Sequence, residues 1–188
     1  LGDVYKRQPY KLCTFSRVMK EKGIEDAINA VESVNAHFGR TVYTLDIFGQ
    51  IDVEYKERFS QLEKSFPDYI SYGGAIEANK SVETLKSYFA LLFPTYYKGE
   101  GFAGTLIDAM SAGVPVIASD WKYNPEFVVP GKTGVIIKNC NAERLAEELI
   151  NIAAAPEKWN SMRLSALKES EKYKPDIAAR PLIDRING

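Results

Sequence analysis

The spacing of apolar residues along the chain alternates between a pattern typical of strands and one typical of helices. Residues 11–18 have the composition of a buried strand, and residues 41–48 are a β-branched and aromatic run that ends before Gly49. Between these runs, apolar residues recur every three or four positions, which predicts an amphipathic helix ended by Gly39. The apolar face of this helix consists of Ile24, Ala27, Ile28, Val31, Val34 and Phe38.

The same alternation continues along most of the chain. Further strands are expected at residues 69–75, 90–94, 114–119 and 134–137. Further helices are expected at residues 55–66, 82–89, 103–112, 125–128, 142–154 and 156–171. Strict alternation of continuous apolar strands with helices favours βαβ crossovers. The predicted fold class is therefore α/β, a Rossmann-like parallel sheet with helices on both faces.

The two ends of the chain differ from the region between them. The chain begins with Leu1 rather than Met, and residues 1–8 fit neither strand nor helix periodicity. We expect residues 1–10 to be a non-native or disordered leader. Residues 11–173 are expected to form one domain, since 188 residues provide one full core but not two. Residues 174–188 are expected to be a tail, and the whole chain a piece of a longer protein.

Composition and charge narrow the class of protein. Hydrophobic residues make up 45% and charged residues 26%, which is ordinary for a soluble globular domain. A net charge of −1 gives no reason to expect nucleic acid as a partner. No apolar run approaches the roughly 20 residues that span a bilayer. Cys13 and Cys140 have no metal-ligand spacing, and we expect them to be buried thiols of a reducing compartment.

Charged and small residues gather directly after the predicted strands. In an open parallel sheet, ligands bind outside the carboxyl ends of the strands. Arg17 and Lys22 follow the first strand, and the run from Glu100 through Asp108 follows the fourth. In that run, Gly101 to Gly104 precede a helix whose free N–H groups and dipole favour an anion. This part of the sequence therefore predicts an anion site at the carboxyl edge.

The residue types around this loop suit a diphosphate with a sugar on each side. Arg17 can make bidentate contacts to phosphate oxygens, and Lys22 can act as a point charge. Glu100 and Asp108 are eight residues apart, so Glu100 would lie beside the start of the helix and Asp108 one to two turns into it. Carboxylates accept hydrogen bonds from hydroxyl groups, so each could hold one sugar.

These motifs together resemble the signature of the glycosyl transferases group 1, a large retaining family of the two-domain GT-B type. The resemblance lies in the run from Glu100 to Ser119, which is similar to the family's Glu–x7–Glu loop and helix. Arg17 and Lys22 match its Arg–x4–Lys pair. Asn124-Pro-Glu-Phe-Val and Gly131-Lys-Thr-Gly-Val-Ile match its next landmarks in order. The resemblance covers residues 11–155 and the C-terminal Rossmann-like domain of the family only.

The resemblance implies a hexosyl transfer from a nucleoside diphosphate sugar to an acceptor hydroxyl, with retention. A UDP-sugar is the expected donor, and no cofactor is expected. The expected role is polysaccharide biosynthesis in the cytoplasm. The full-length protein could also associate with the membrane surface. The acceptor would bind the N-terminal domain, a partner that this chain lacks. The implied catalytic residues are Arg17, Lys22 and Glu100. The implied donor-binding residues are Gly101, Phe102, Ala103, Gly104, Thr105 and Asp108.

Within this scheme, Arg17 and Lys22 bind the diphosphate as the leaving group, Glu100 contacts the donor sugar and Asp108 holds the ribose. The family usually has Glu where this chain has Asp108, so the ribose contact is expected to be looser or to pass through water. The chain contains no Asp-x-Asp triplet, and we expect no metal: the fixed cations and the helix dipole would take its place.

Each feature also has a purely structural interpretation. Gly101 and Gly104 could serve a tight turn, and the cations and Asp108 could be solvated surface residues. Their order at the ends of successive strands favours a site. Elsewhere, His37 is expected at the surface, while Trp121 is expected to pack against the following short helix or to touch a substrate.

Two other functions remain open from the residues alone. A sugar-nucleotide epimerase or a phosphorylase would keep the fold and change the reaction. The chain could also bind a nucleotide without turnover, because the acceptor half is absent.

Overall fold

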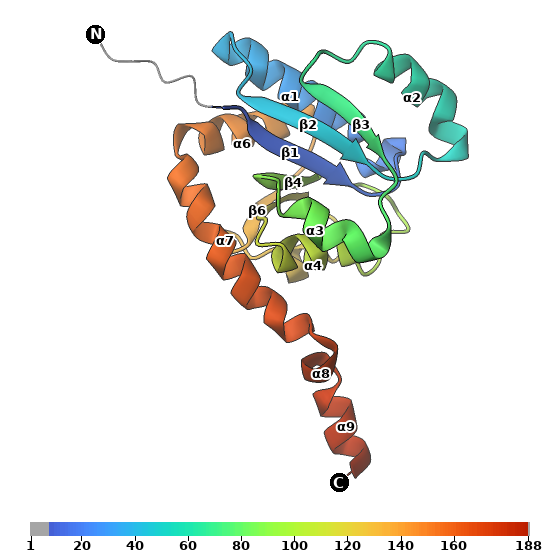
Figure 1. Cartoon of the computed structure of the whole chain (residues 1–188), viewed down its shortest axis with the longest axis vertical. Coiled ribbons are helices and arrows are strands. Elements are labelled where there is room, and N and C mark those ends of the chain that lie inside the picture. Colours follow the sequence, from blue (N-terminus) through green and yellow to red (C-terminus); the bar gives the residue numbers. More distant parts are fainter. Residues whose placement is uncertain (1–7, 188) are drawn as a thin grey trace.

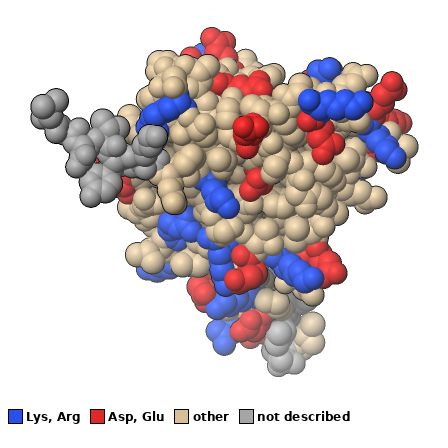
Figure 2. All heavy atoms as spheres, turned by 45° about the horizontal axis from the view of Figure 1, so that its top comes forward, with Lys and Arg blue, Asp and Glu red and all other residues tan. Residues whose placement is uncertain are grey.

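The computed structural model describes residues 8–187, and for residues 181–183 and 187 the backbone alone. Of the leader expected at residues 1–10, residues 1–7 lie outside the described residues. The described chain folds into one sheet with helices packed around it (Figure 1). On the face drawn in Figure 2, basic and acidic side chains are interspersed, in keeping with the net charge of −1.

The sheet has six parallel strands in the order β3-β2-β1-β4-β5-β6. This order, which reverses beside β1, is that of a doubly wound Rossmann sheet. The predicted α/β fold class is confirmed. The strands are β1 (Tyr10–Phe15), β2 (Tyr43–Phe48), β3 (Ile70–Gly74), β4 (Ala90–Phe93), β5 (Val116–Ser119) and β6 (Gly134–Ile137).

Helices follow the strands in the predicted alternation. They are α1 (Ile24–Phe38), α2 (Lys56–Glu63), α3 (Ser81–Leu85), α4 (Gly104–Ser111), α5 (Asn124–Phe127), α6 (Ala142–Ala154), α7 (Pro156–Ser170), α8 (Pro175–Ala178) and α9 (Arg180–Asn187). Four 3₁₀ turns join them, η1 (Lys20–Lys22), η2 (Val53–Tyr55), η3 (Ala78–Lys80) and η4 (Glu171–Tyr173).

Two apolar cores lie on the two faces of the sheet. Neighbouring strand residues belong to different cores, as Leu91 and Leu92 do, because successive side chains point to opposite faces. One core includes α1 and α6, which pack against each other, and the other includes α3 and α4. The near-continuous apolar strands seen in the sequence are explained by burial on both faces.

Several elements differ from the sequence-based expectation. The first strand, expected at residues 11–18, is β1, which spans Tyr10–Phe15 and so begins within the expected leader. The helix expected at residues 82–89 is α3, which ends at Leu85, because Tyr88 and Phe89 are instead buried in the turn directly before β4. The Trp159 indole donates to the Phe89 carbonyl at 2.9 Å and fixes that turn. The tail, for which the sequence predicts no helix, forms α8 and α9, which continue away from the sheet beyond α7 (Figure 1).

Asn35 joins the end of α1 to the start of β2. Its side-chain amide donates to the Tyr43 carbonyl at 2.9 Å. Its Oδ1 accepts from the backbone N–H groups of Val42 and Tyr43 at 2.8 and 3.0 Å. Only 4% of Asn35 is exposed, so water cannot readily replace these bonds. The α1–β2 connection therefore depends on one buried amide.

We predict that Asn35→Ala lowers the free energy of unfolding by about 2–4 kcal/mol, because it leaves three buried backbone groups without partners. Urea unfolding followed by circular dichroism measures the change. Asn29→Ala, at an exposed position of the same helix, is the matched control and should change stability little. Equal effects of the two substitutions would show that the buried amide is not needed.

Candidate functional site

The sequence-predicted residues Lys22 and Glu100 meet at the carboxyl edge of the sheet, although 78 residues separate them. Lys22 ends η1, in the segment after β1, and Glu100 lies in the loop between β4 and α4. Strands β1 and β4 are adjacent and parallel, so the segments that follow them emerge side by side.

A glycine allows the two segments to come close. Gly23 has a φ of 71°, and a Cβ on it would lie 2.3 Å from the carbonyl oxygen of Pro94. Only glycine fits this left-handed position without a clash. Next to it, the Tyr96 N–H donates to the Glu21 carbonyl at 2.8 Å and joins the two segments by a backbone hydrogen bond.

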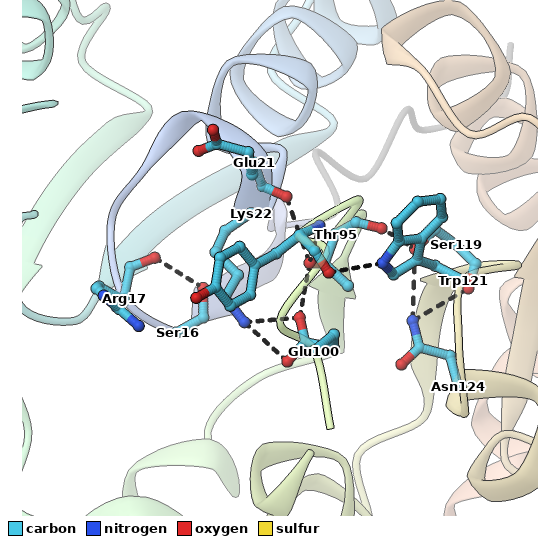
Figure 3. Close-up of polar contacts among 10 residues, drawn as sticks. Ser16, Arg17, Glu21, Lys22, Thr95, Glu100, Ser119, Trp121 and Asn124 are labelled. Atoms are coloured by element: carbon cyan, nitrogen blue, oxygen red, sulfur yellow. Dashed lines mark hydrogen bonds and ion pairs between the residues drawn. The ribbon is translucent and has the colours of Figure 1, made fainter. Parts of the chain in front are cut away.

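Lys22 and Glu100 form a close, shielded ion pair (Figure 3). The Lys22 ammonium donates to both carboxylate oxygens of Glu100, at 2.6 and 2.8 Å. The side chains are only 10% and 9% exposed, respectively. The ammonium also lies over the rings of Tyr97 and Phe93, 5.2 and 5.6 Å from their centres. This is the most shielded ion pair within residues 8–187.

A chain of buried hydrogen bonds supports Glu100 from the sheet side (Figure 3). The Thr95 hydroxyl lies 2.7 Å from Glu100 Oε2 and donates to it. The Ser119 hydroxyl donates to the Thr95 carbonyl at 2.5 Å, and the Asn124 amide donates to the Ser119 carbonyl at 3.1 Å. Thr95, Ser119 and Asn124 are all buried. The carboxylate is therefore held by Thr95 as well as by Lys22, and residues of β5 and α5 hold Thr95 in turn.

Arg17 lies at the same edge but is far more exposed. Its side chain is 51% exposed and forms an ion pair with Asp52 at 3.3 Å. Its guanidinium is 5.8 Å from the centre of the Tyr97 ring, the same ring that Lys22 contacts. The structure thus brings both predicted cations to one aromatic side chain. Beside the Arg17–Asp52 pair is a hollow of about 500 Å³, lined in part by Lys20 and Asp52.

The loop of Gly101, Phe102 and Ala103 leads into α4, as the sequence predicts. Ala103 is the N-cap and makes no side-chain capping hydrogen bond. Gly104 begins the helix, and both it and Thr105 have some exposure to solvent. Phe102 is 71% exposed and its ring meets Phe127 edge-on at 5.3 Å. The first turn of α4, which follows Glu100 in the chain, is therefore a helix N-terminus without a side-chain cap, although the Gly104 and Leu106 N–H groups donate to the Phe102 and Ala103 carbonyls.

Asp108 is held separately from Glu100. Its Oδ2 accepts a hydrogen bond from the Ser81 hydroxyl at 2.6 Å, and Ser81 is the first residue of α3. Asp108 is half-buried between these two packed helices. The two predicted carboxylates are therefore held by hydrogen bonds from different residues.

Sequence reasoning gave no role to Thr95 and Ser119, which complete the support of Glu100. Their only signal is their place: Thr95 is two residues after β4, and Ser119 is the last residue of β5. The Trp121 indole donates to the Tyr97 carbonyl at 2.7 Å, so Trp121 joins the two loops. His37 is exposed at the end of α1, as expected.

Cys13 is buried, as expected, and Cys140 is partly buried. Burial raises the pKa of the Cys13 thiol well above its usual value, and it raises that of Cys140 to about 12. Among the described residues, no group of three or more His, Cys, Asp or Glu side chains is close enough to hold a metal ion. None of the described helices is long and apolar enough to cross a membrane.

A doubly wound parallel sheet with cations and a helix N-terminus at its carboxyl edge defines a Rossmann-like domain of the nucleotide-binding type. Comparison with known families makes this more specific. The family model of the glycosyl transferases group 1 matches residues 4–169. The chain belongs to this family, and the resemblance drawn from its motifs is confirmed.

Individual relatives agree with the family. The chain is 33% identical over 132 residues to the UDP-N-acetylglucosamine--peptide N-acetylglucosaminyltransferase GtfA subunit of Streptococcus gordonii, covering 70% of this chain and 25% of that protein. It is 27% identical over 146 residues to a GDP-mannose-dependent mannosyltransferase of Corynebacterium glutamicum, covering 75% of this chain and 37% of that protein. The chain spans between 25% and 36% of the length of the first three curated relatives that it matches.

Solved structures share the fold. The pneumococcal O-GlcNAc transferase GtfA, in complex with UDP and GlcNAc, aligns with a TM-score of 0.76 and 23% identity over 96% of this chain and 36% of that chain. Anabaena HepE, in complex with UDP and glucose, aligns with a TM-score of 0.80 and 15% identity over 95% of this chain and 48% of that chain. At these identities the likeness shows the fold alone.

Proposed function

We propose that the full-length protein transfers a hexosyl group from a nucleoside diphosphate sugar to an acceptor hydroxyl, with retention at the anomeric carbon. In this proposal residues 11–173 bind the donor, and a further domain binds the acceptor. The observation that carries the proposal is the shielded Lys22–Glu100 pair, which lies at the carboxyl edge and precedes the first turn of α4, a turn without a side-chain cap.

The proposed chemistry uses fixed charges. When the acceptor oxygen bonds to the anomeric carbon, the bond from that carbon to the diphosphate breaks and negative charge grows on the departing oxygen, to which the acceptor hydroxyl gives up its proton. Lys22, Arg17 and the N–H groups at the start of α4 would stabilise that charge. The rings of Tyr97 and Phe93 hold the Lys22 ammonium at this edge, so the cation is in place before the donor binds.

The two carboxylates would orient the sugars on either side of the diphosphate. Glu100 would accept hydrogen bonds from hydroxyls of the transferred sugar, and Asp108 from those of the ribose. Asp108 already accepts a hydrogen bond from Ser81, which leaves its remaining acceptor positions for the ribose or for a bridging water. The separate roles agree with the separate contacts of the two side chains: Glu100 bonds to Lys22 and Thr95, and Asp108 bonds to Ser81.

A UDP-sugar is the donor that we propose. The Streptococcus gordonii relative carries UDP-N-acetylglucosamine in its name, and two structural neighbours are described as complexes with UDP. Since the Corynebacterium glutamicum relative is named as GDP-mannose-dependent, the base needs a direct test. We also propose a role in polysaccharide biosynthesis in the cytoplasm; a relative named for amylovoran biosynthesis supports the biosynthetic role.

The first prediction concerns the cations. Lys22→Ala and Arg17→Ala should each weaken the binding of UDP by roughly 1.5–3 kcal/mol, the range for hydrogen bonds to charged groups. The effect should be larger for Lys22, which is more shielded. Isothermal titration calorimetry measures both. Lys132→Ala, an exposed cation in the turn before β6 at the opposite edge, is the matched control.

Inorganic pyrophosphate separates the roles of the cations and Asp108 in the same assay. The two cation variants should also weaken pyrophosphate binding, whereas Asp108→Asn should weaken UDP only, since pyrophosphate has no ribose. The site lies elsewhere if all three variants bind UDP as the unaltered chain does.

The second prediction concerns metal. If Arg17, Lys22 and the first turn of α4 neutralise the diphosphate, UDP binding should change little when EDTA is added. Calorimetry with EDTA, and then with excess Mg²⁺ or Mn²⁺, makes the comparison. Loss of affinity in EDTA with recovery on adding either ion would contradict the proposed charge balance.

The third prediction concerns turnover. The 188-residue chain should bind a donor but transfer no sugar efficiently, because the proposal assigns acceptor binding and half of the cleft to a further domain. Release of UDP from UDP-glucose and UDP-N-acetylglucosamine, with and without sugar acceptors, is the measurement. Robust acceptor-dependent release by this chain would show that the acceptor site lies within it.

A further inference from the structure

The Lys22–Glu100 pair joins two residues to which the proposed function gives different parts of the donor. Lys22 is assigned to the diphosphate and Glu100 to the transferred sugar. In the structure each is the other's partner, with contacts of 2.6 and 2.8 Å. Two of the three N–H donors of the Lys22 ammonium are used by Glu100, so a diphosphate that takes more than the third must draw the ammonium away from Glu100.

We propose that this ion pair makes the site select the intact sugar nucleotide over the free nucleoside diphosphate. The inference rests on the proposed function and adds a selectivity to it. A free nucleoside diphosphate takes Lys22 and offers no group to Glu100. The carboxylate, only 9% exposed, then loses its cation while it stays shielded from water. Separating a shielded pair in this way is unfavourable, because a charge is left uncompensated.

An intact donor balances the exchange. Its diphosphate replaces the carboxylate at Lys22, and its sugar hydroxyls replace the ammonium at Glu100. Each charged group then keeps a hydrogen-bonding partner. After transfer the sugar has left, Glu100 again lacks a partner, and re-formation of the pair favours release of the nucleoside diphosphate.

Thr95 holds the Glu100 carboxylate in place, so the carboxylate needs a partner from the donor once Lys22 binds the diphosphate. Its hydroxyl donates to Glu100 Oε2 at 2.7 Å, and only 1% of Thr95 is exposed. Its carbonyl is in turn held by Ser119 at 2.5 Å. A Glu100 side chain without this support could turn to water when Lys22 leaves. Thr95 is therefore a positioning residue that acts through Glu100.

The pair changes what Glu100→Gln should do. From the sequence alone, Glu100 contacts only the sugar, so the substitution should leave the binding of a free nucleoside diphosphate unchanged. With the ion pair present, the neutral amide releases Lys22 from a competing charge. The substitution should then strengthen the binding of the free nucleoside diphosphate and weaken that of the intact donor.

The test is calorimetry on the full 188-residue chain at fixed ionic strength. UDP, GDP and ADP are titrated first. The nucleoside diphosphate with the highest affinity is then compared with its glucose conjugate, and with its N-acetylglucosamine or mannose conjugate. Glu100→Gln should bind the free nucleoside diphosphate about tenfold more tightly, the change that about 1.4 kcal/mol produces. It should bind the tighter conjugate more weakly than the unaltered chain does.

Matched variants separate this effect from a change in stability. Glu147→Gln removes an acidic side chain from an exposed ion pair with Arg144 on α6 and should leave both affinities unchanged. Thr95→Val should lower the preference for the intact donor, whereas Thr95→Ser, which keeps the hydroxyl, should retain it. Because the readout is a ratio of two affinities in one variant, a loss of folded protein does not mimic it.

The outcomes distinguish this inference from the proposed function. If the unaltered chain binds neither the three nucleoside diphosphates nor their sugar conjugates, the proposed function itself is wrong and the inference falls with it. If the unaltered chain binds one of them but Glu100→Gln does not bind it more tightly, the selectivity mechanism is overturned and the donor site stands. Should Glu100→Gln not fold, the Thr95 variants decide in the same way.

Discussion

The close approach of Gly23 to Pro94 determines the geometry of the carboxyl edge. The glycine backbone lies against the Pro94 carbonyl at a distance that leaves no room for a Cβ, which would lie 2.3 Å from the oxygen. Lys22 directly precedes this contact, and Glu100 lies in the loop that Pro94 begins. The ion pair and the Tyr96–Glu21 backbone hydrogen bond both depend on the short distance between Gly23 and Pro94. A side chain at position 23 would push η1 away from β4 and open the site.

The fold was largely predictable because it is repetitive. Strands buried on both faces and helices with one apolar face leave periodic signals, and these identified the α/β class and the order of the elements. The boundary of α3 could not be found in this way. Tyr88 and Phe89 continue its apolar pattern, but the buried indole of Trp159, 70 residues away, donates to the Phe89 carbonyl directly before β4. Contacts between distant residues have no period in the sequence.

The candidate site was predictable in its members and less so in its connections. Lys22 and Glu100 could be placed together, because residues after adjacent parallel strands meet at one edge. That they pair with each other, and that Asp108 bonds to Ser81, depends on side-chain geometry. Thr95 shows the same limit, since a threonine after a strand is ordinary until its neighbours are known.

The start of α4 has a consequence for the order of the loop itself. Most helices satisfy their first N–H groups with a side chain at the N-cap, but Ala103 has no side-chain oxygen to offer. An anion bound there would act as the missing cap, so occupancy of the site and order of the first helical turn would be thermodynamically linked. The exposed Phe102 directly precedes the N-cap, so its position depends on that of the first turn. A substrate would in this way complete the helix that binds it.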